Sequence, residues 1–239
     1  MASTLKRRAR SEGSLTDRVY YTVRERILRG QLPPGTALSR RKLAAELGVS
    51  FLPVSEALQR LEQDGLLESR PRAGTRVRTP TSDEIRGRAV VREALEAEAA
   101  KLCCERAAFQ ERLELRGMGR QMDTLFARAS NGHADTEFLY VVHQHHAGLH
   151  LRIAEYARCP ELREAIEKNH VLIYNWFYDI AAEQRSLPEH FHADLVEAVT
   201  GDSPEAADKV MRAHVRYGLE STLKAVEYHT KAGDWRVKR

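Results

Sequence analysis

The segment between Leu38 and Leu67 constrains the fold most, because it has the pattern of two short helices joined by a tight turn. Ser39 is a typical N-cap residue for the first helix, and Gly48 stands where a left-handed residue would end it. Ser50 can cap the second helix. The apolar positions of that helix share one face: Val54, Ala57, Leu58 and Leu61. Two short helices with a glycine in the turn predict a helix-turn-helix, although an ordinary helical hairpin in a core is the alternative for the isolated motif.

The flanking residues favour the first interpretation. Upstream, apolar residues recur every four positions from Leu15 to Ile27 and predict an amphipathic helix over 15–29. Downstream, two short strands are expected at 66–68 and 75–78, on either side of a turn that contains proline and glycine. Three helices followed by a two-stranded wing are the order of a winged helix-turn-helix.

Charge is distributed unevenly along the chain. Residues 1–80 hold 16 Lys and Arg against 8 Asp and Glu, which is a net charge of +8. The remaining residues hold 22 against 26, so they carry −4 and the whole-chain value of +4 hides the difference. A basic module fused to a mildly acidic one indicates a polyanionic partner for the first module.

From Asp83 onward the pattern is helical almost throughout, with no strand-like alternation and no internal repeat. Proline, glycine and asparagine residues divide this part into six candidate helices, at about 83–108, 109–130, 135–157, 160–184, 187–200 and 203–229. We expect an all-α bundle of six or seven helices and a mainly α chain. Four parts are expected: a disordered basic arm (1–14), the winged helix-turn-helix (15–79), the helical domain (83–229) and a tail (230–239).

Cysteine usage and hydropathy indicate the cellular compartment in which we expect the protein. No apolar run reaches the roughly 20 residues of a membrane span, and no apolar stretch follows the basic start as in a signal peptide. The three cysteines lack the spacing of a metal knuckle, so we expect reduced thiols in the cytoplasm and no membrane partner. Of the adjacent pair Cys103 and Cys104, one is expected to face the core and the other to turn away.

All ten histidines lie after residue 130. His146 and His150 are four residues apart and project from one face of a helix, which His143 shares. His192 and His214 lie on apolar stripes of two later helices. Imidazoles from three helices that point into a bundle are typical of a metal site, and ordinary hydrogen-bonded core histidines are the alternative.

These motifs resemble those of a known family. Residues 15–78 resemble the winged-helix domain of GntR-family bacterial transcription regulators, with LPPG at 32–35, GVS at 48–50 and EAL at 56–58. Residues 83–229 resemble the FCD effector-binding domain of its FadR-like subfamily. The residues that carry this second likeness are Arg92-Glu93-Ala94-Leu95-Glu96, Leu149-His150, Cys159-Pro160-Glu161-Leu162, His192, Ala198-Val199, Gly201-Asp202 and Met211-Arg212-Ala213-His214.

The resemblance implies a metal site, because metal-binding members of the family use one Asp and three His. Their positions fall on His146, in place of the Asp, and on His150, His192 and His214. An all-nitrogen set favours Zn²⁺ or Ni²⁺ over Mg²⁺ and Ca²⁺. Since this set has no anionic ligand, we expect the ion to be uncompensated by protein charge and a small organic acid to bind it as effector. Arg92 is the candidate cationic partner of that acid by resemblance.

The resemblance also places the DNA-reading residues on the hairpin and the wing: Arg40, Arg41, Ser50, Phe51, Ser55, Gln59, Arg70, Arg72, Gly74 and Arg76. Relatives usually carry arginine at the positions of Phe51 and Ser55, so we expect an operator that differs from the typical one. Phe51 could contact a thymine methyl group. Because one reading helix covers only a few base pairs, we expect a homodimer on a palindromic, double-stranded operator.

The sequence indicates a transcription regulator, which we expect to be a repressor and not an enzyme, and two other functions are the alternatives. A metal-dependent hydrolase would need a general base beside its first histidine, but Ala147 follows His146. A ligand-free architectural DNA-binding protein would leave the buried histidines without a role.

Overall fold

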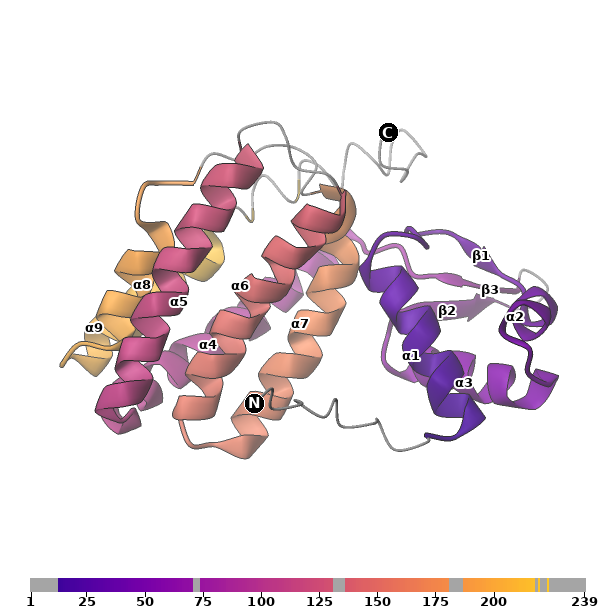
Figure 1. Cartoon of the computed structure of the whole chain (residues 1–239), viewed down its shortest axis with the longest axis horizontal. Coiled ribbons are helices and arrows are strands. Elements are labelled where there is room, and N and C mark those ends of the chain that lie inside the picture. Colours follow the sequence, from indigo (N-terminus) through magenta and orange to yellow (C-terminus); the bar gives the residue numbers. More distant parts are fainter. Residues whose placement is uncertain are drawn as a thin grey trace, which may run out of the picture. The chain divides into compact units, whose positions relative to one another are not determined.

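The computed structural model describes residues 13–70, 74–130, 136–180, 187–217, 219 and 223, and for residues 136 and 171–180 it describes the backbone alone. The chain divides into two compact units, residues 1–27 with 35–78 and residues 28–34 with 79–239. Figure 1 shows a small unit of helices and short strands in indigo and purple, and a larger helical unit in magenta to yellow. Most of the predicted basic arm and the predicted tail lie outside the described residues.

Three helices form most of the N-terminal unit: α1 (Leu15–Leu28), α2 (Arg40–Leu47) and α3 (Phe51–Gln63). Their apolar stripes meet in one core, in which Val19 and Val23 of α1 and Val54 and Leu61 of α3 are fully buried. Leu15, the first residue of the predicted α1 stripe, is 52% exposed, whereas the later residues of the α1 and α3 stripes face inward as the sequence predicts, and the helix-turn-helix is confirmed.

The turn between α2 and α3 is built as the cap residues predict. The hydroxyl of Ser39 accepts a hydrogen bond from the backbone N–H of Lys42 at 3.3 Å. Gly48 ends α2 in the left-handed region with φ of 63°, and its N–H donates to the carbonyl of Ala44. Ser50 precedes α3 in extended conformation, but its side chain makes no capping bond, so that part of the prediction is wrong.

The wing is a three-stranded antiparallel sheet of β1 (Ala37–Leu38), β2 (Leu67–Arg70) and β3 (Gly74–Val77) in the order β1-β3-β2. Only β2 and β3 were expected from the sequence. The extra strand pairs Ala37 with Arg76 and has two residues, too few to show the alternation by which a strand is recognised.

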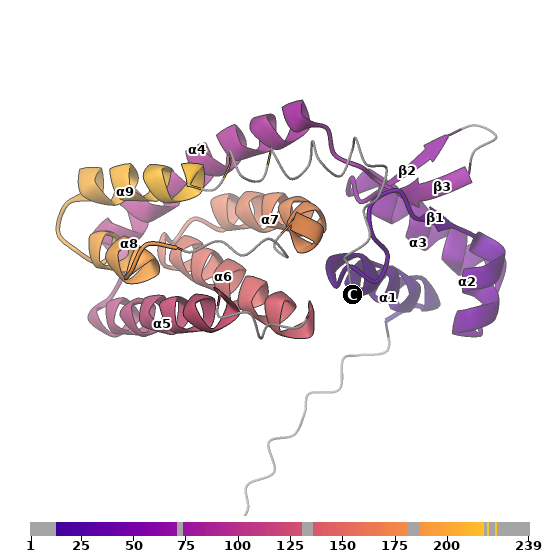
Figure 2. The same ribbon diagram turned by 90° about the horizontal axis from the view of Figure 1, so that it is seen from above.

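The second unit is helical, which confirms the mainly α fold. Its described part holds six helices: α4 (Ser82–Arg106), α5 (Phe109–Arg128), α6 (Thr136–Tyr156), α7 (Pro160–Ile180), α8 (Phe191–Val199) and α9 (Pro204–Arg216). Figure 2 shows α9 and the start of α4 along one side of the bundle and α5 along the opposite side. The helix expected from 187 begins only at Phe191, because Pro188 and the left-handed His190 (φ 61°) precede it.

The central position of α4 explains a wrong prediction about the paired cysteines. Both Cys103 and Cys104 are buried, and the thiol of Cys104 donates to the carbonyl of Gly201 at 3.2 Å. Helix α4 packs against α6, α7 and α9, and its exposed residues in this stretch are Glu98, Glu105 and Arg106, so both cysteines lie on its covered side. Adjacent residues on such a helix can both be covered.

A glycine sets the distance between α5 and α8. A Cβ atom on Gly119 would lie 2.5 Å from Cγ2 of Val196 and 2.9 Å from the carbonyl oxygen of His192. The absence of a side chain at this point therefore lets α8, which carries His192, approach α5 closely.

The helices of the described residues include no segment with the length and hydropathy of a membrane span.

Candidate metal site and DNA-reading face

Helices α6 and α9 bring three imidazole rings together inside the bundle. His146 and His150 lie one turn apart on α6, and His214 lies in the last turn of α9. Nε2 of His146 is 3.1 Å from Nε2 of His150 and 3.2 Å from Nε2 of His214, and the third separation, from His150 to His214, is also 3.2 Å. The three ring nitrogens form a nearly equilateral triangle.

Hydrogen bonds alone cannot satisfy this triangle. Each Nε2 carries either a proton or a lone pair, so at least one pair of nitrogens must face each other with like groups. Nitrogens held 2.0–2.1 Å from one ion lie about 2.9 Å apart at a right angle and about 3.4 Å apart at a tetrahedral angle. The observed 3.1–3.2 Å lies between these values. The three side chains therefore fit a transition-metal ion.

His192 lies beside the triangle on the first turn of α8. Ring nitrogens of His146, His192 and His214 lie within 4.8 Å of one another. The carboxylate of Asp123, on α5, accepts from Nδ1 of His192 at 2.8 Å and from the backbone N–H groups of His192 and Ala193 at 2.9 and 3.0 Å. Asp123 thus caps α8 and fixes the His192 tautomer that leaves Nε2 unprotonated.

A buried carboxylate supports His150 in the same way. Glu96, on α4, is 1% exposed. Its Oε2 lies 2.7 Å from Nδ1 of His150, and its Oε1 accepts from Nε of Arg92 at 2.8 Å and lies 2.6 Å from Nε2 of His170. A proton on Nδ1 of His150 faces Glu96, which leaves the Nε2 lone pair for the triangle.

These two carboxylates correct the expectation that no protein charge would compensate an ion. Glu96 and Asp123 each lie one imidazole ring away from the ring nitrogens. Neither carboxylate is a direct ligand, since each lies behind a histidine, and the charges of the four ligand side chains alone do not include them. Glu96, Asp123 and His170 were all missed as site residues. The one signal for Glu96 was a charged residue one turn after Arg92, between the apolar Leu95 and Ala97.

Burial keeps the imidazoles neutral. It lowers the pKa of His150 to about 4, although Glu96 opposes the shift. Burial, reinforced by the neighbouring imidazoles and Arg92, lowers the pKa of both His146 and His214 well below the usual value. Burial also lowers the pKa of His192, against the effect of Asp123. Neutral imidazole is the form that binds metal ions.

Arg92 lies at the edge of this cluster. Its Nη2 is 3.4 Å from Nε2 of His150, and its side chain is 12% exposed. On α7, the amide of Asn169 is buried, and neither its nitrogen nor its oxygen has a hydrogen-bond partner among the described residues. A buried amide without a partner is unusual in a folded protein.

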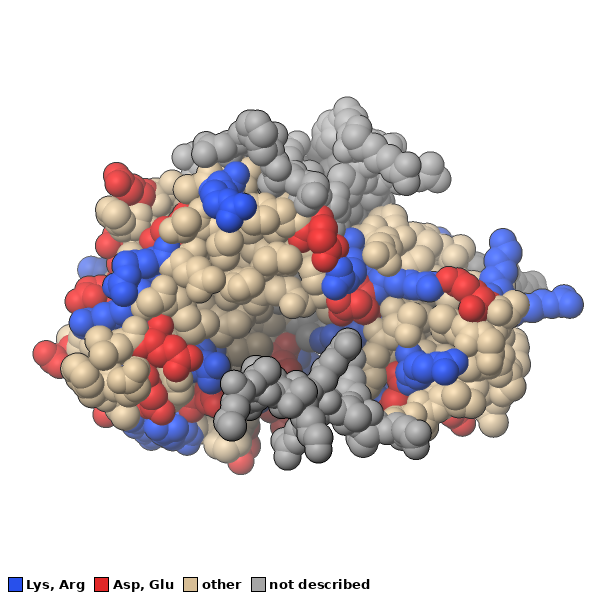
Figure 3. Space-filling model, viewed as in Figure 1, with Lys and Arg blue, Asp and Glu red and all other residues tan. Residues whose placement is uncertain are grey.

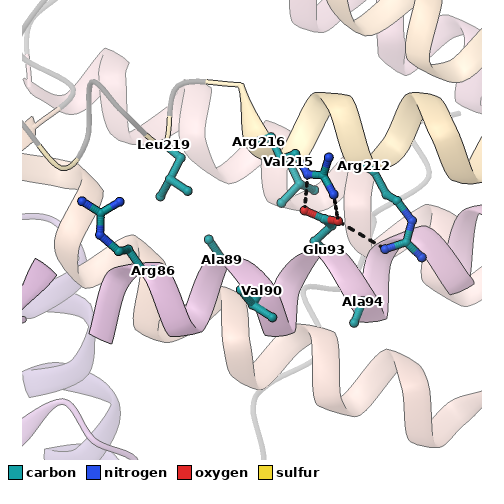
Figure 4. A pocket seen from close by; sticks show the side chains of 9 residues that line it. All are labelled: Arg86, Ala89, Val90, Glu93, Ala94, Arg212, Val215, Arg216 and Leu219. Carbon is teal, nitrogen blue, oxygen red and sulfur yellow. Dashed lines mark hydrogen bonds and ion pairs between the residues drawn. The ribbon is translucent and has the colours of Figure 1, made fainter. Parts of the chain in front are cut away.

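A separate groove of about 550 Å³ lies between α4 and α9 (Figure 4). Glu93 lies in its wall and accepts two hydrogen bonds from Arg216, at 2.6 and 2.5 Å, and one from Arg212 at 3.3 Å. These ion pairs hold α9 against α4 and so fix the position of His214 relative to Glu96. The groove is lined by Arg86, Ala89, Val90, Glu93, Ala94, Arg212, Val215, Arg216 and Leu219.

The predicted DNA-reading residues of α2 and α3 differ in their exposure and in their hydrogen bonds within the unit. Phe51 is 59% exposed, and Gln59 is exposed as well. Ser55 donates its hydroxyl proton to the carbonyl of Phe51 at 3.1 Å. On α2, Arg41 is exposed, whereas Arg40 donates to the hydroxyl of Thr75 in the wing at 3.2 Å.

The wing presents further predicted residues. Arg70 and Arg76 pair with Glu68 at 3.2 and 4.0 Å, and Gly74 begins β3 with φ of 78°. Arg72 lies outside the described residues. Figure 3 shows Lys and Arg side chains that protrude from the edge of the N-terminal unit where α2 and the sheet lie, whereas acidic and basic side chains intermingle over the bundle. Acidic side chains lie beside these cations on the same unit in this view, and Glu68 is one acidic residue that pairs with wing arginines.

Comparison with known proteins identifies both units. The model of bacterial regulatory proteins of the gntR family matches residues 15–77, and the FCD domain model matches residues 89–217. The HTH-type transcriptional regulator YdhC of Bacillus subtilis is 27% identical over 87% of this chain and 91% of its own length. The HTH-type transcriptional repressor RspR of Escherichia coli is 22% identical over 92% and 93%.

Solved structures show the same fold. McbR/YncC of E. coli aligns with a TM-score of 0.70 at 22% identity and covers 90% of this chain and 99% of its own. A GntR transcriptional regulator from Rhodococcus sp. RHA1 aligns with a TM-score of 0.71 at 20% identity, over 89% and 99% of the two chains.

Proposed function

Because the chain belongs to the GntR family of transcription regulators and carries an FCD domain, we propose that its bundle binds a divalent transition metal and a small carboxylate, and that this effector modulates operator binding. Proteins of this family regulate transcription and are not enzymes. The observation that carries the proposal is the triangle of Nε2 atoms from His146, His150 and His214.

In this proposal, His146, His150, His192 and His214 hold Zn²⁺ or Ni²⁺. The ion would supply a strong positive charge and, in a five- or six-coordinate geometry, a further position for an oxygen ligand. Glu96 and Asp123 orient His150 and His192, because each places a carboxylate oxygen within 2.8 Å of the Nδ1 atom. Such carboxylate–histidine pairs typically change metal affinity by about 10- to 100-fold.

The charge of the cluster favours an anionic effector. One divalent ion, two carboxylates and the guanidinium of Arg92 leave a net charge of about +1 in a buried site. Nη2 of Arg92 lies 3.4 Å from Nε2 of His150, whereas Nε of Arg92 is the atom that donates to Glu96. Nη2 can therefore donate to an anion that is bound beside His150. A small carboxylate would connect α4 with α6.

At the N-terminal unit, we propose that α3 enters the major groove of a palindromic operator and that Arg41 and the wing contact phosphates. Two copies of the chain are needed to cover both half-sites. The effector can change operator affinity only through its different affinities for the two arrangements of the dimer.

Calorimetry on the full-length protein tests the effector proposal. A panel of small acids such as malonate, succinate and citrate is titrated into protein loaded with Zn²⁺ and into protein stripped with a chelator. We expect binding only to the loaded protein, a change in operator affinity on binding, and loss of both with Arg92→Ala or His150→Ala. Equal binding with and without metal would show that the effector is bound elsewhere.

The variant His145→Ala is the matched control. His145 lies on the same helix as His146 and His150, but it is exposed and contacts the carbonyl of Val141. Its loss leaves the response to acids unchanged if the buried triangle carries the function.

A further inference from the structure

The first turn of α3 exposes two neighbouring apolar side chains. Phe51 is 59% exposed and Leu52 is 65% exposed, which makes them the most exposed large apolar residues in the described part of the N-terminal unit. The next two residues, Pro53 and Val54, are buried in the core. The helix therefore begins with an apolar pair that faces outward.

The polar side chains behind this pair are already bonded within the unit. Ser55 donates to the carbonyl of Phe51, and Glu56 accepts from the hydroxyl of Thr16 at 2.7 Å. Arg60 pairs with Asp17 at 2.8 Å, and its guanidinium lies 4.0 Å from the ring centre of Tyr20. The first cation along α3 is thus held against α1, away from the exposed first turn.

Base edges differ in how they match an apolar side chain. In the major groove, thymine presents a C5-methyl group, whereas cytosine presents a hydrogen at the same position. Phenylalanine is among the side chains that contact this methyl group. Polar edges of guanine and adenine would lose hydrogen bonds to water without gaining a partner.

We propose that Phe51 and Leu52 recognise pyrimidines that carry a C5-methyl group, namely thymine and 5-methylcytosine, in each half-site. This inference rests on the proposed insertion of α3 into the major groove. Operator binding would then respond to cytosine methylation at the same positions, because 5-methylcytosine offers the same methyl group in the same groove.

The surroundings favour DNA over a protein partner for this pair. Arg41 and Lys42 at the start of α2 are exposed, and the unit carries an excess of positive charge. A stable protein interface buries about 800 Å² on each partner. A side chain as large as phenylalanine buries roughly 150–250 Å², so two side chains supply only a part of that area.

The test starts from operators that the full-length protein selects from random duplexes. Each symmetric pair of thymines is then replaced by deoxyuridine, which pairs identically but lacks the methyl group, and affinity is measured by fluorescence anisotropy. Burial of one methyl-sized group changes affinity about four-fold, so two half-sites predict a loss of about 15-fold at the recognised positions. Cytosine that is placed there should gain affinity when it is methylated at C5.

The double variant Phe51→Ala, Leu52→Ala should bind thymine and deoxyuridine operators equally well. Phe109→Ala is the matched control, because Phe109 is 76% exposed on α5 of the other unit and its loss should leave the methyl dependence unchanged. Melting temperature and salt-dependent binding to random DNA verify that each variant folds.

The possible outcomes separate this inference from the proposed function. A selected operator whose affinity is insensitive to deoxyuridine at every position overturns the inference and leaves DNA binding intact. A double variant that loses affinity equally for both bases also overturns it, because the pair would then act through a contact other than the methyl group. Failure to select any sequence contradicts both the inference and the proposed function.

Discussion

The two units of this chain place their candidate functional residues in opposite surroundings. In the N-terminal unit, Arg41, Phe51 and Gln59 are exposed, and few neighbours restrict their identity. In the bundle, His150 and His214 are buried, and each polar atom needs a partner. In the bundle, a change in one buried polar side chain therefore leaves its neighbours without a partner. On the DNA face, one exposed side chain can be replaced without a change in the others.

This difference leads to a graded set of expected effects. Changes in the bundle should disturb stability and metal affinity together, because Glu96 contacts Arg92, His150 and His170 at once. Changes on the DNA face should alter operator affinity and leave stability nearly unchanged.

The largest effect is expected from acid. Below about pH 6.5 the unfolded chain protonates its histidines. In the folded protein, burial lowers the pKa of His150 to about 4 and also lowers the pKa of His192 and of His214 from the usual value. The unfolded state then binds more protons, so stability falls as pH falls, by up to about 1.4 kcal/mol per pH unit for each group. The melting temperature of the metal-free protein should drop by roughly 10 °C per unit between pH 6.5 and 5. A flat profile would contradict burial of neutral imidazoles.

The next effect concerns the buried carboxylate. Glu96→Ala leaves the guanidinium of Arg92 without its buried partner and should cost about 3–5 kcal/mol of unfolding free energy. Denaturant titration measures this loss. Glu98→Ala, two residues further on α4, removes an exposed carboxylate that pairs with Lys101 and should change stability by less than about 0.5 kcal/mol. Equal losses of unfolding free energy in the two variants would contradict a buried charge network around Glu96.

A smaller effect is expected from helix spacing. Gly119→Ala places a Cβ atom 2.5 Å from Val196 and 2.9 Å from the carbonyl of His192, so α8 must move away from α5. Overpacking of this kind costs about 1–3 kcal/mol. Because α8 carries His192, metal affinity should fall as well. Gly117→Ala, on the same helix with nothing within 4 Å of the added atom, is the control and should have no such effect on either quantity.

The smallest effect is expected on the DNA face. Arg41→Ala removes one exposed cation, so it should reduce the slope of log affinity against log salt by about 1 and leave the melting temperature unchanged. A salt titration in the anisotropy assay measures the slope. Unchanged operator affinity would place the DNA-binding surface elsewhere on the unit.

The sequence predicted elements whose signals are local. Apolar spacing, Ser39 and Gly48 identified α2 and α3, and inward histidines on three helices indicated a cluster. The two-residue strand β1 was missed because it is too short to show a pattern. Glu96 and Asp123 were missed because their partners lie 54 and 69 residues away in the chain (Glu96 to His150 and Asp123 to His192). Contacts of that kind depend on packing that no local pattern records.

Elemental analysis of the purified protein after incubation with Zn²⁺ or Ni²⁺ and removal of free ions tests the histidine cluster most directly. We predict one equivalent of metal per chain for the wild type and for His145→Ala, and less than about a tenth of that for His150→Ala combined with His214→Ala. Less than a tenth of an equivalent in the wild type, with either ion, would contradict a metal site at this triangle.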